Sequence, residues 1–404
     1  MSRREWAASW AAAALLPKAQ NQETYAVIGA GVFGAWTAYH LVSAGHKVIL
    51  LDQYGPASSR ASSGGESRII RCSYGPDEVY TRMAKRSLAL WSRFFAETGR
   101  NLLHRIGVLW MAKPNLAYVE QSRETLRKFG IPFRDLSPAD LQKQYPQIHT
   151  AAGTIAILEP ESGALMARES VAAVVEAFVR RGGTYRLDAV QTPRGRGKLD
   201  AVLTSSGESI PAGGFVFACG PWLGKVFPHI LGNRIFPTRQ EVFFFGIPSG
   251  DRRFSLSQIP VWIDFSDERG MYGFPDLETR GFKVAFDKHG PLVDPDTLNR
   301  FVMPEKVAAA RAYVNERFPA LGNSPIVDSR VCQYENTANG DFIIDRHPDF
   351  ENVWIAGGGS GHGFKHGPAV GEYTAARVTG ARNPPVEPRF SLASKGAEQH
   401  RSVY

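Results

Sequence analysis

The clearest hydrophobic pattern of the chain runs from Thr24 to Asp52. A short apolar run, Tyr25–Ile28, leads into a glycine-rich turn. Apolar residues then recur at helical spacing as far as Ala44, and a second apolar run covers Val48–Leu51. Short apolar runs bounded by turn residues indicate buried strands, whereas recurrence every three or four residues indicates an amphipathic helix. The stretch therefore predicts a strand, a tight turn, a helix and a second strand.

The same criteria predict the other elements of the chain. Helices are expected over Asp77–Glu97, Tyr118–Phe129, Ala167–Arg181 and Pro304–Arg317, after the cap-like Ser137, and from near Pro368 to near Gly380. Strands are expected over Ile106–Met111, Phe215–Gly220, Arg239–Phe245, Met271–Phe274, Phe282–Phe286 and Val353–Ala356. This mixture predicts an α/β (α+β overall) fold, in which a Rossmann-like nucleotide-binding domain is interleaved with a substrate domain built on an antiparallel sheet.

The order of the elements also gives expected domain boundaries. The nucleotide-binding domain is assigned residues 23–105, 151–232 and 326–385, the substrate domain residues 106–150 and 233–325, and a C-terminal tail residues 386–404. Residues 1–22 stand apart, because Arg3 and Arg4 precede the apolar stretch Trp6–Leu16. This arrangement resembles a twin-arginine export signal, and a plain N-terminal extension is the alternative. The protein is accordingly expected in the periplasm after export, or otherwise in the cytoplasm.

Composition and charge exclude several classes of protein. The 404 residues are 43% hydrophobic and 21% charged, as in an ordinary globular protein, and the net charge is +8. The basic residues are scattered, so a nucleic-acid-binding function is not indicated. No apolar run reaches the roughly 18 residues of a membrane span. The three cysteines, Cys72, Cys219 and Cys332, are widely spaced and indicate neither a disulfide framework nor a metal site, and Cys219 is interpreted as a small core residue.

The turn after the first strand carries the dinucleotide-binding fingerprint. Gly29 allows the tight turn, Gly31 lets backbone N–H groups approach a pyrophosphate, and Gly34 lets the helix pack on the sheet. The helix N-terminus favours phosphate charge. Asp52, at the end of the second strand, can accept hydrogen bonds from ribose hydroxyls. The fingerprint predicts a bound dinucleotide, and either NAD or FAD satisfies it.

A second glycine-rich loop, at 357–363, follows the expected strand Val353–Ala356. Its site candidates are Gly358, Gly359, Gly361, His362 and Gly363. Backbone N–H groups in such a loop can crowd an anionic or planar group, and a reduced flavin ring carries negative charge that they would stabilise. A nicotinamide enzyme does not need this loop near its C-terminus. The loop therefore favours a flavin, with a plain strand-to-helix turn as the alternative.

Two arginines, Arg68 and Arg71, bracket two apolar residues after a Gly/Ser-rich loop. In an extended segment their side chains point to opposite faces. One arginine could then reach a cofactor and the other a substrate. Taken alone, the pair could also be two surface cations.

Several further motifs occur together and in order: SSGGESRIIR at 62–71, YGFP at 272–275 with FK at 282–283, CQY at 332–334, FIID at 342–345 and SGHGFK at 360–365. With them, the chain resembles the monomeric sarcosine oxidase and N-methyl amino acid oxidase family. These are FAD-dependent amine oxidases of the D-amino acid oxidase superfamily. Their relatives include the N-methyltryptophan, pipecolate and fructosyl-amine oxidases. The resemblance runs from about Thr24 to Gly380.

The resemblance implies a role for each matching residue. It implies FAD bound covalently through the 8α carbon of the flavin to the sulfur of Cys332, whose thiolate Arg68 or Arg71 could favour. It implies that Arg71 and Lys365 clamp the substrate carboxylate, with Lys365 also close to the flavin. Lys283 matches the lysine that promotes the reaction with oxygen. Tyr272 and Tyr334 match tyrosines that border the substrate.

Two positions depart from the family pattern. Gly64 and Asp287 stand where sarcosine oxidases carry histidines, one near the flavin and one beside the substrate amine. Asp287 could attract an ammonium or a hydroxylated substrate, or turn outward. Gly64 removes bulk, which suggests room for a substrate larger than sarcosine.

The predicted activity is FAD-dependent oxidation of the C–N bond of a secondary amino acid, N-methyl or cyclic. The imine product would hydrolyse, and O2 would be reduced to H2O2. Four alternatives remain: a fructosyl-amino acid oxidase, a flavin amine dehydrogenase that passes electrons to a carrier, a flavin-binding subunit without turnover, and a NAD-dependent dehydrogenase. The expected partners are a small amine or amino acid and O2, with no metal, for a protein expected to be a monomer.

Overall fold

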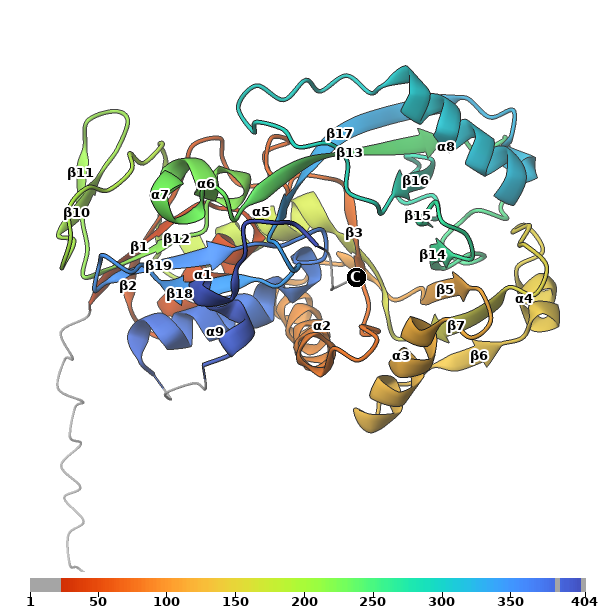
Figure 1. Cartoon of the computed structure of the whole chain (residues 1–404), viewed down its shortest axis with the longest axis horizontal. Helices are drawn as coiled ribbons and strands as arrows, with labels where there is room; N and C mark the ends of the chain where they lie inside the picture. The colour runs from red at the N-terminus through yellow and green to blue at the C-terminus, as the bar shows by residue number, and fades with distance from the viewer. Residues whose placement is uncertain (1–22, 382–385, 401–404) are drawn as a thin grey trace, which may run out of the picture.

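A computed structural model describes residues 23–381 and 386–400 of the chain (Figure 1). The expected export signal at 1–22 lies outside the described residues. The first of two large sheets has the strand order β18-β19-β12-β1-β2-β9. Its strands are β1 (Thr24–Ile28), β2 (Lys47–Asp52), β9 (Thr184–Leu187), β12 (Gly214–Phe217), β18 (Ile343–Arg346) and β19 (Val353–Gly357). All neighbours are parallel except β18 and β19, as expected for a Rossmann-like sheet.

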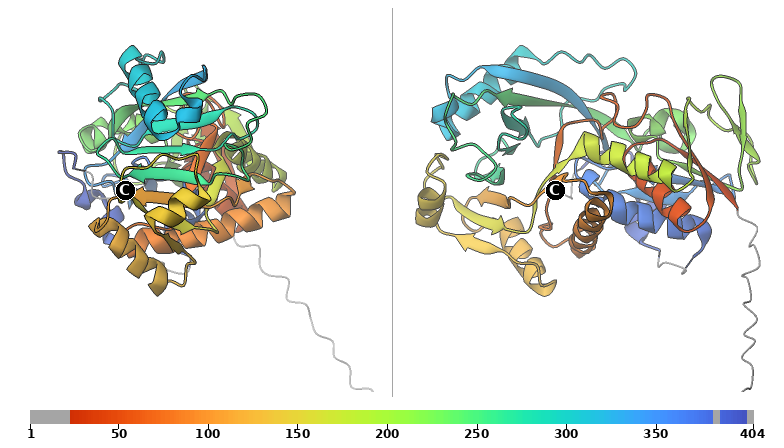
Figure 2. Two further views of the ribbon diagram at one scale, coloured as in Figure 1. Left: turned by 90° about the vertical axis from the view of Figure 1, so that its right-hand side faces the viewer. Right: turned by 180° about the vertical axis from the view of Figure 1, so that it is seen from behind.

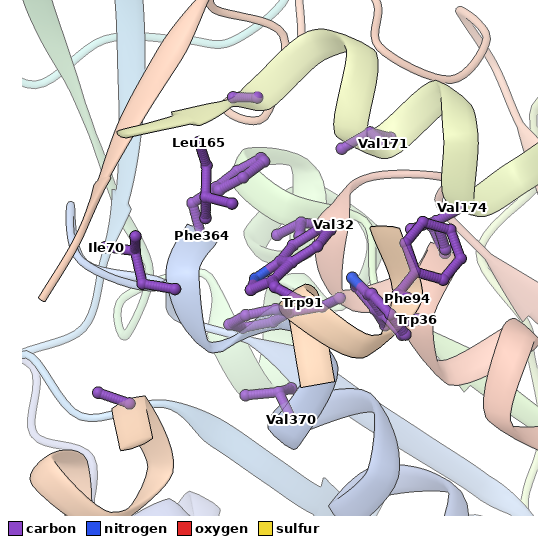
Figure 3. Close-up of a cluster of buried hydrophobic side chains, with 14 of the residues drawn as sticks. Val32, Trp36, Ile70, Trp91, Phe94, Leu165, Val171, Val174, Phe364 and Val370 are labelled. Carbon is purple, nitrogen blue, oxygen red and sulfur yellow. The ribbon is translucent and has the colours of Figure 1, made fainter. Parts of the chain in front are cut away.

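Both faces of this sheet are buried. Successive side chains of a strand point to opposite faces, so one strand contributes to two cores. Tyr25 and Val27 of β1 join the core beneath four helices, whereas Ala26 and Ile28 join a second core on the other face. The four helices are α1 (Val32–Ser43), α2 (Glu78–Thr98), α5 (Ala167–Arg180) and α9 (Gly367–Thr379). Figure 3 shows Trp36 of α1 against Trp91 and Phe94 of α2, with Val174 of α5 beside them.

The opposite face is covered by short elements. They are the strand pair β10 (Ala201–Leu203) and β11 (Ser209–Pro211), η1 (Gly220–Trp222), α6 (Leu223–Val226) and α7 (Pro228–Leu231). Leu223, Phe227 and Leu231 pack there against Phe215 and Phe217 of β12. The strand expected over 215–220 therefore ends at Phe217, and the chain turns into η1 across the end of the sheet.

The second large sheet has the strand order β17-β13-β16-β15-β14-β5-β7-β6. Its strands are β5 (Val108–Ala112), β6 (Arg134–Leu136), β7 (Ile155–Glu159), β13 (Phe236–Phe245), β14 (Val261–Phe265), β15 (Met271–Phe274), β16 (Phe282–Phe286) and β17 (Ile326–Asn336). Helix α8 (Pro304–Arg317) covers the face of this sheet that is turned away from the first sheet (Figures 1 and 2). Helices α3 (Ala117–Lys128) and α4 (Pro138–Gln144) lie at its β6 end, and Ser137 caps α4 as expected.

Two expected domain boundaries differ from the sheet pairings. β7 pairs with β5, and β17 pairs with β13 along ten residues, so both strands belong to the eight-stranded sheet. The sequence placed them on the nucleotide side, because each lies next to a segment that belongs there. We therefore propose to assign 155–159 and 326–336 to the substrate domain. All pairs in this sheet are antiparallel except β5 and β14, between which the chain visits the other domain.

A three-stranded sheet joins the two halves. It consists of β3 (Ser67–Ile70), β8 (Gly163–Met166) and β4 (Leu103–His104), in the order β3-β8-β4. The short helices η2 (Pro319–Leu321), η3 (Phe364–His366), η4 (Pro388–Phe390) and η5 (Leu392–Ser394) complete the described elements. In the described part of the chain, no helix is both long enough and apolar enough to cross a bilayer.

Candidate functional site

A cavity of about 310 Å³ lies at the carboxyl ends of the parallel strands. It begins at Asp52 and Tyr54, passes Gly31 at the start of α1, and ends at the glycine loop beside Phe364. Ligands of open α/β sheets bind in this position, outside the carboxyl ends of the strands. The fingerprint and the second glycine loop, which are more than 300 residues apart, therefore line one elongated site.

The first turn has the geometry that the fingerprint requires. Gly29 adopts a φ of +106°, and a Cβ there would lie 2.3 Å from the carbonyl oxygen of Ala218. A Cβ on Gly34 would lie 1.8 Å from the carbonyl oxygen of Gly29, so the helix packs directly on the turn. The Asp52 carboxylate accepts hydrogen bonds from the backbone N–H groups of Ala30 and Tyr54, at 2.7 and 2.8 Å. Asp52 is thereby held at the end of the cavity.

The glycine loop lies against the carboxyl group of Glu335. Gly359, Gly361 and Gly363 line the cavity, whereas Gly358 does not. The backbone N–H groups of Gly358 and Gly359 donate to Oε1 of Glu335. Burial raises the pKa of Glu335 to about 7. Two of the backbone donors expected for the flavin are therefore engaged by this side chain, which itself lines the cavity.

Cys332 and Arg68 meet beside this cavity. The Sγ of Cys332 lies 3.6 Å from the guanidinium of Arg68, which also donates to the carbonyl oxygen of Ser62 at 2.7 Å. Arg68 lines the cavity, and Cys332 is half-buried behind it. From the sequence, either Arg68 or Arg71 could favour the thiolate of Cys332. Arg68 is the arginine beside Cys332, because Arg71 points into a different space.

That space is a second, smaller cavity of about 60 Å³. It shares Arg68, Tyr334, Gly361 and Phe364 with the first cavity, so the two cavities are adjacent. Its remaining lining residues are Ile69, Arg71, Trp110, Ile263, Phe265, Tyr272, Asp287, His362 and Lys365. A small polar ligand in the second cavity would therefore lie next to whatever occupies the glycine-loop end of the first.

Arg71 is held in place by a buried carboxylate that the sequence did not indicate. Glu159, at the end of β7, accepts hydrogen bonds from the backbone N–H groups of Cys72 and Ser73 and from the indole of Trp110. The guanidinium of Arg71 donates to the carbonyl oxygen of Ser73 and lies 4.6 Å from the Trp110 ring. Glu159 thus fixes the segment that carries Arg71.

Lys365 enters the same cavity from the glycine loop. Its Nζ donates to the hydroxyl of Tyr74 and to the carbonyl oxygen of His362, both at 2.9 Å. The His362 side chain is tied to the carbonyl of Gly340 at 2.9 Å and faces Tyr74. Burial, and then the charge of Arg71, lower the pKa of Lys365 well below its usual value.

Asp287, Tyr272 and Tyr334 also line the second cavity, and the ring of Tyr334 lies against Gly361 of the glycine loop. Asp287 follows β16 and lines the cavity, so it does not turn outward. The hydroxyls of Tyr272 and Tyr334 lie 3.4 Å apart. Burial raises the pKa of both phenols, which keeps them neutral at pH 7. The second cavity therefore combines three basic side chains, Arg68, Arg71 and Lys365, with one carboxylate and an aromatic border.

Lys283 lies behind β3 and lines neither cavity. Its Nζ donates to the carbonyl and the hydroxyl of Ser67, both at 3.2 Å. Burial, and then the charge of Arg68, lower its pKa to about 7. Lys283, on β16, therefore contacts Ser67, the residue before Arg68 on β3, and its charge can change near neutral pH.

The expectation that Gly64 leaves room for a larger substrate is wrong. Gly64 lines neither cavity, and a Cβ there would lie 1.8 Å from the carbonyl oxygen of Ser58. The backbone of the 58–64 loop fills the space that a side chain would occupy. Cys219 packs against the core on the outer face of the first sheet, as expected, and it also lines the first cavity.

Glu335, Glu159 and Tyr74 are the site residues that the sequence did not single out. A carboxylate directly after the CQY motif was a usable signal for Glu335. No local pattern distinguishes Glu159 or Tyr74, because their roles depend on long-range contacts. Across the described part of the chain, no group of three or more His, Cys, Asp and Glu side chains could hold a metal ion.

The first cavity fits FAD. It offers a carboxylate at the ribose end, a helix N-terminus at its middle and a second glycine loop at the far end. Gly31 caps α1, and a Cβ there would approach only the hydroxyl of Ser63, at 3.5 Å, so the space beside it is open to a pyrophosphate. An isoalloxazine ring at the glycine loop would lie against the second cavity.

The chain is similar to known flavoenzymes along nearly its whole length. It is 32% identical to a monomeric sarcosine oxidase of Bacillus sp. (strain B-0618) and 31% identical to the peroxisomal sarcosine oxidase of Mus musculus, in each case covering 86% of this chain and 89% of the relative.

Two solved structures share the fold. They are the Aspergillus fumigatus fructosyl amine:oxygen oxidoreductase, Amadoriase I (TM-score 0.76, 19% identity, 92% of this chain and 89% of that chain), and the L-proline dehydrogenase from P. horikoshii (TM-score 0.79, 22% identity, 92% and 97%). The family model described as FAD dependent oxidoreductase matches residues 24–377. The chain therefore belongs to the family of FAD-dependent oxidoreductases.

Proposed function

We propose that the protein is a flavoprotein oxidase of a secondary amino acid, N-methyl or cyclic, that forms an imine and reduces O2 to H2O2. One observation carries the proposal. Arg71 and Lys365 converge in a small cavity that adjoins the glycine-loop end of the cofactor cavity. Two basic groups in a buried space suit a carboxylate, and they fix its orientation through charge-assisted hydrogen bonds when the complex has formed.

The aromatic border supports the same proposal. Tyr272, Tyr334 and Phe265 surround the space that the substrate amine and its substituent would occupy. With a volume of about 60 Å³, the cavity favours a compact N-methyl or cyclic amino acid over one that carries a sugar. This favours the main proposal over the fructosyl-amino acid alternative.

When bound, FAD supplies the acceptor for a hydride equivalent from the carbon next to the substrate nitrogen. The chain's own residues bind the carboxylate, exclude water and hold the amine at that acceptor. Lys283, close to Arg68, would place positive charge near the reacting ring when oxygen is reduced. This role favours an oxidase over a dehydrogenase that uses a carrier.

We also propose that Cys332 forms the covalent bond to the flavin. The proximity of its Sγ to Arg68, at 3.6 Å, supports this, because a guanidinium favours the nucleophilic thiolate. The protein is further proposed to act as a monomer.

A peroxide-coupled screen tests the function. Purified protein is given sarcosine, N-methyl amino acids, proline, pipecolate and fructosyl amino acids, and peroxide is measured against oxygen consumed. We expect stoichiometric peroxide from one or more compact secondary amino acids. The matching amines without a carboxylate serve as the control, and equal rates on them would contradict the roles of Arg71 and Lys365. Dye reduction without peroxide would support a dehydrogenase instead.

A further inference from the structure

Lys365, like Arg68, Arg71 and Lys283, forms no ion pair within 4 Å among the described residues, and unlike the two arginines it can lose its proton. The Nζ group donates to two neutral oxygen atoms, the Tyr74 hydroxyl and the His362 carbonyl. No carboxylate lies within 4 Å of it among the described residues, and only 4% of its surface is exposed. A buried ammonium without a counter-ion is costly, so the neutral amine is favoured in the empty cavity.

The charged and titratable groups around Lys365 act in both directions, and burial is the largest influence on its pKa. They come from the segment after β3, from β7, from the residue after β16 and from the glycine loop: Arg71, Cys72, Tyr74, Glu159, Asp287, His362 and His366. Burial and Arg71 disfavour the ammonium form, Asp287, Cys72 and Glu159 favour it, and the pKa is lowered well below its usual value. Burial and the nearby cations also lower the pKa of His366. Its imidazole therefore carries no negative charge that could pair with Lys365.

A neutral lysine amine has two N–H bonds and one lone pair. Both N–H bonds of Lys365 have acceptors, in Tyr74 and His362. The lone pair takes the remaining tetrahedral position, and Lys365 lines the second cavity. Lys365 can therefore accept a proton from a ligand in that cavity without breaking either hydrogen bond.

We propose that Lys365 removes the ammonium proton of the zwitterionic substrate as the substrate binds, an inference that rests on the proposed function. One N–H bond of the substrate breaks and one forms at Nζ. The substrate changes from an ammonium carboxylate to an amine carboxylate, and Lys365 changes from an amine to an ammonium. The total charge is unchanged.

This transfer links binding to activation. The arriving carboxylate supplies the anion that Lys365 lacks, so the proton becomes more stable on Nζ, next to Arg71. The substrate nitrogen is left with the free lone pair that oxidation of the C–N bond requires. Recognition of the carboxylate and deprotonation of the amine are therefore coupled through a single side chain.

The inference is tested by proton uptake in the flavin-loaded protein. A plain carboxylate such as acetate brings the anion but no transferable proton. In weakly buffered solution at pH 8 with an indicator dye, acetate binding should take up about one proton per site, because Lys365 must then draw it from water. The flavin absorbance change measures occupancy in the same sample, and the wild-type measurement needs no variant.

Two variants identify the group that takes the proton. Lys365→Arg keeps a permanent cation, so it should bind acetate with no proton uptake. Its flavin reduction rate should rise about tenfold per pH unit up to the substrate's own pKa, whereas the wild-type rate should be flatter. Asp287→Asn should keep the proton uptake.

Acetate binding without proton uptake in the wild type would overturn the inference and leave the proposed function intact. Uptake that survives Lys365→Arg and is lost in Asp287→Asn would assign the proton to Asp287 and also overturn it. A flavin spectrum that responds to no carboxylate or amino acid would overturn the proposed function, and the inference with it.

Discussion

Replacing Glu335 by glutamine should stabilise the protein above pH 7 and change its stability little at pH 5. The Glu335 carboxyl is 8% exposed, and its pKa is raised from 4.5 to about 7 by burial. The folded protein therefore keeps this proton up to about pH 7, whereas the unfolded chain releases it near pH 4.5. Its contribution to stability is fully present below pH 4.5 and is lost as the pH rises through 7.

The size of the effect follows from the shift. About 2.5 pKa units at 1.36 kcal/mol each give about 3 kcal/mol of destabilisation at pH 8 and about 1 kcal/mol at pH 5, which Glu335→Gln should remove. The unfolding entropy of a 404-residue chain is roughly 0.85 kcal/mol/K, so Tm should rise by about 4 °C at pH 8 and about 1 °C at pH 5.

Thermal unfolding of the flavin-loaded protein at both pH values measures this difference. Glutamine keeps the acceptor oxygen for Gly358 and Gly359. The exposed Glu161→Gln is the matched control and should shift Tm equally at the two pH values. A Glu335→Gln effect of the same size at pH 5 and pH 8 would refute the reasoning, because it would mean that the carboxyl does not titrate in this range.

Four further changes test the site. Cys332→Ala should bind flavin that acid precipitation releases, and yellow colour retained on the precipitated variant would contradict the tether. Lys283→Met should slow flavin reoxidation by oxygen about 100-fold or more, measured by stopped flow. In the wild type, reoxidation should slow as the pH rises through about 7, because Lys283 loses its charge there. A reoxidation rate that rises with pH would contradict the role of Lys283. Arg71→Ala should weaken carboxylate binding at least about 30-fold in flavin titrations, and unchanged acetate affinity would exclude the clamp. Asp287→Asn should tighten acetate binding about tenfold, since it removes an anion from the same cavity, and weaker binding would show that Asp287 attracts the ligand.

Local sequence patterns were enough to predict the secondary-structure elements and the dinucleotide-binding turn. The strand, turn, helix and strand of Thr24–Asp52 are fixed by hydrophobic period and by glycine positions, which act over a few residues. Helices α2, α3, α5 and α8 begin and end within one or two residues of their expected bounds for the same reason. The order and spacing of the later motifs were enough to indicate the flavoenzyme family.

Which residues lie close together in space depends on the tertiary structure. Strands β7 and β17 joined the eight-stranded sheet because pairing depends on long-range packing, which the local pattern of each strand does not encode. Glu335 lines the cofactor cavity, and Gly64 lines neither cavity. Backbone segments that are distant in sequence set both positions. The protonation of Lys365 depends on the fold for a related reason, because burial and charges from three other parts of the chain set its pKa. The sequence supplied the chemical groups, and the fold decided their environment.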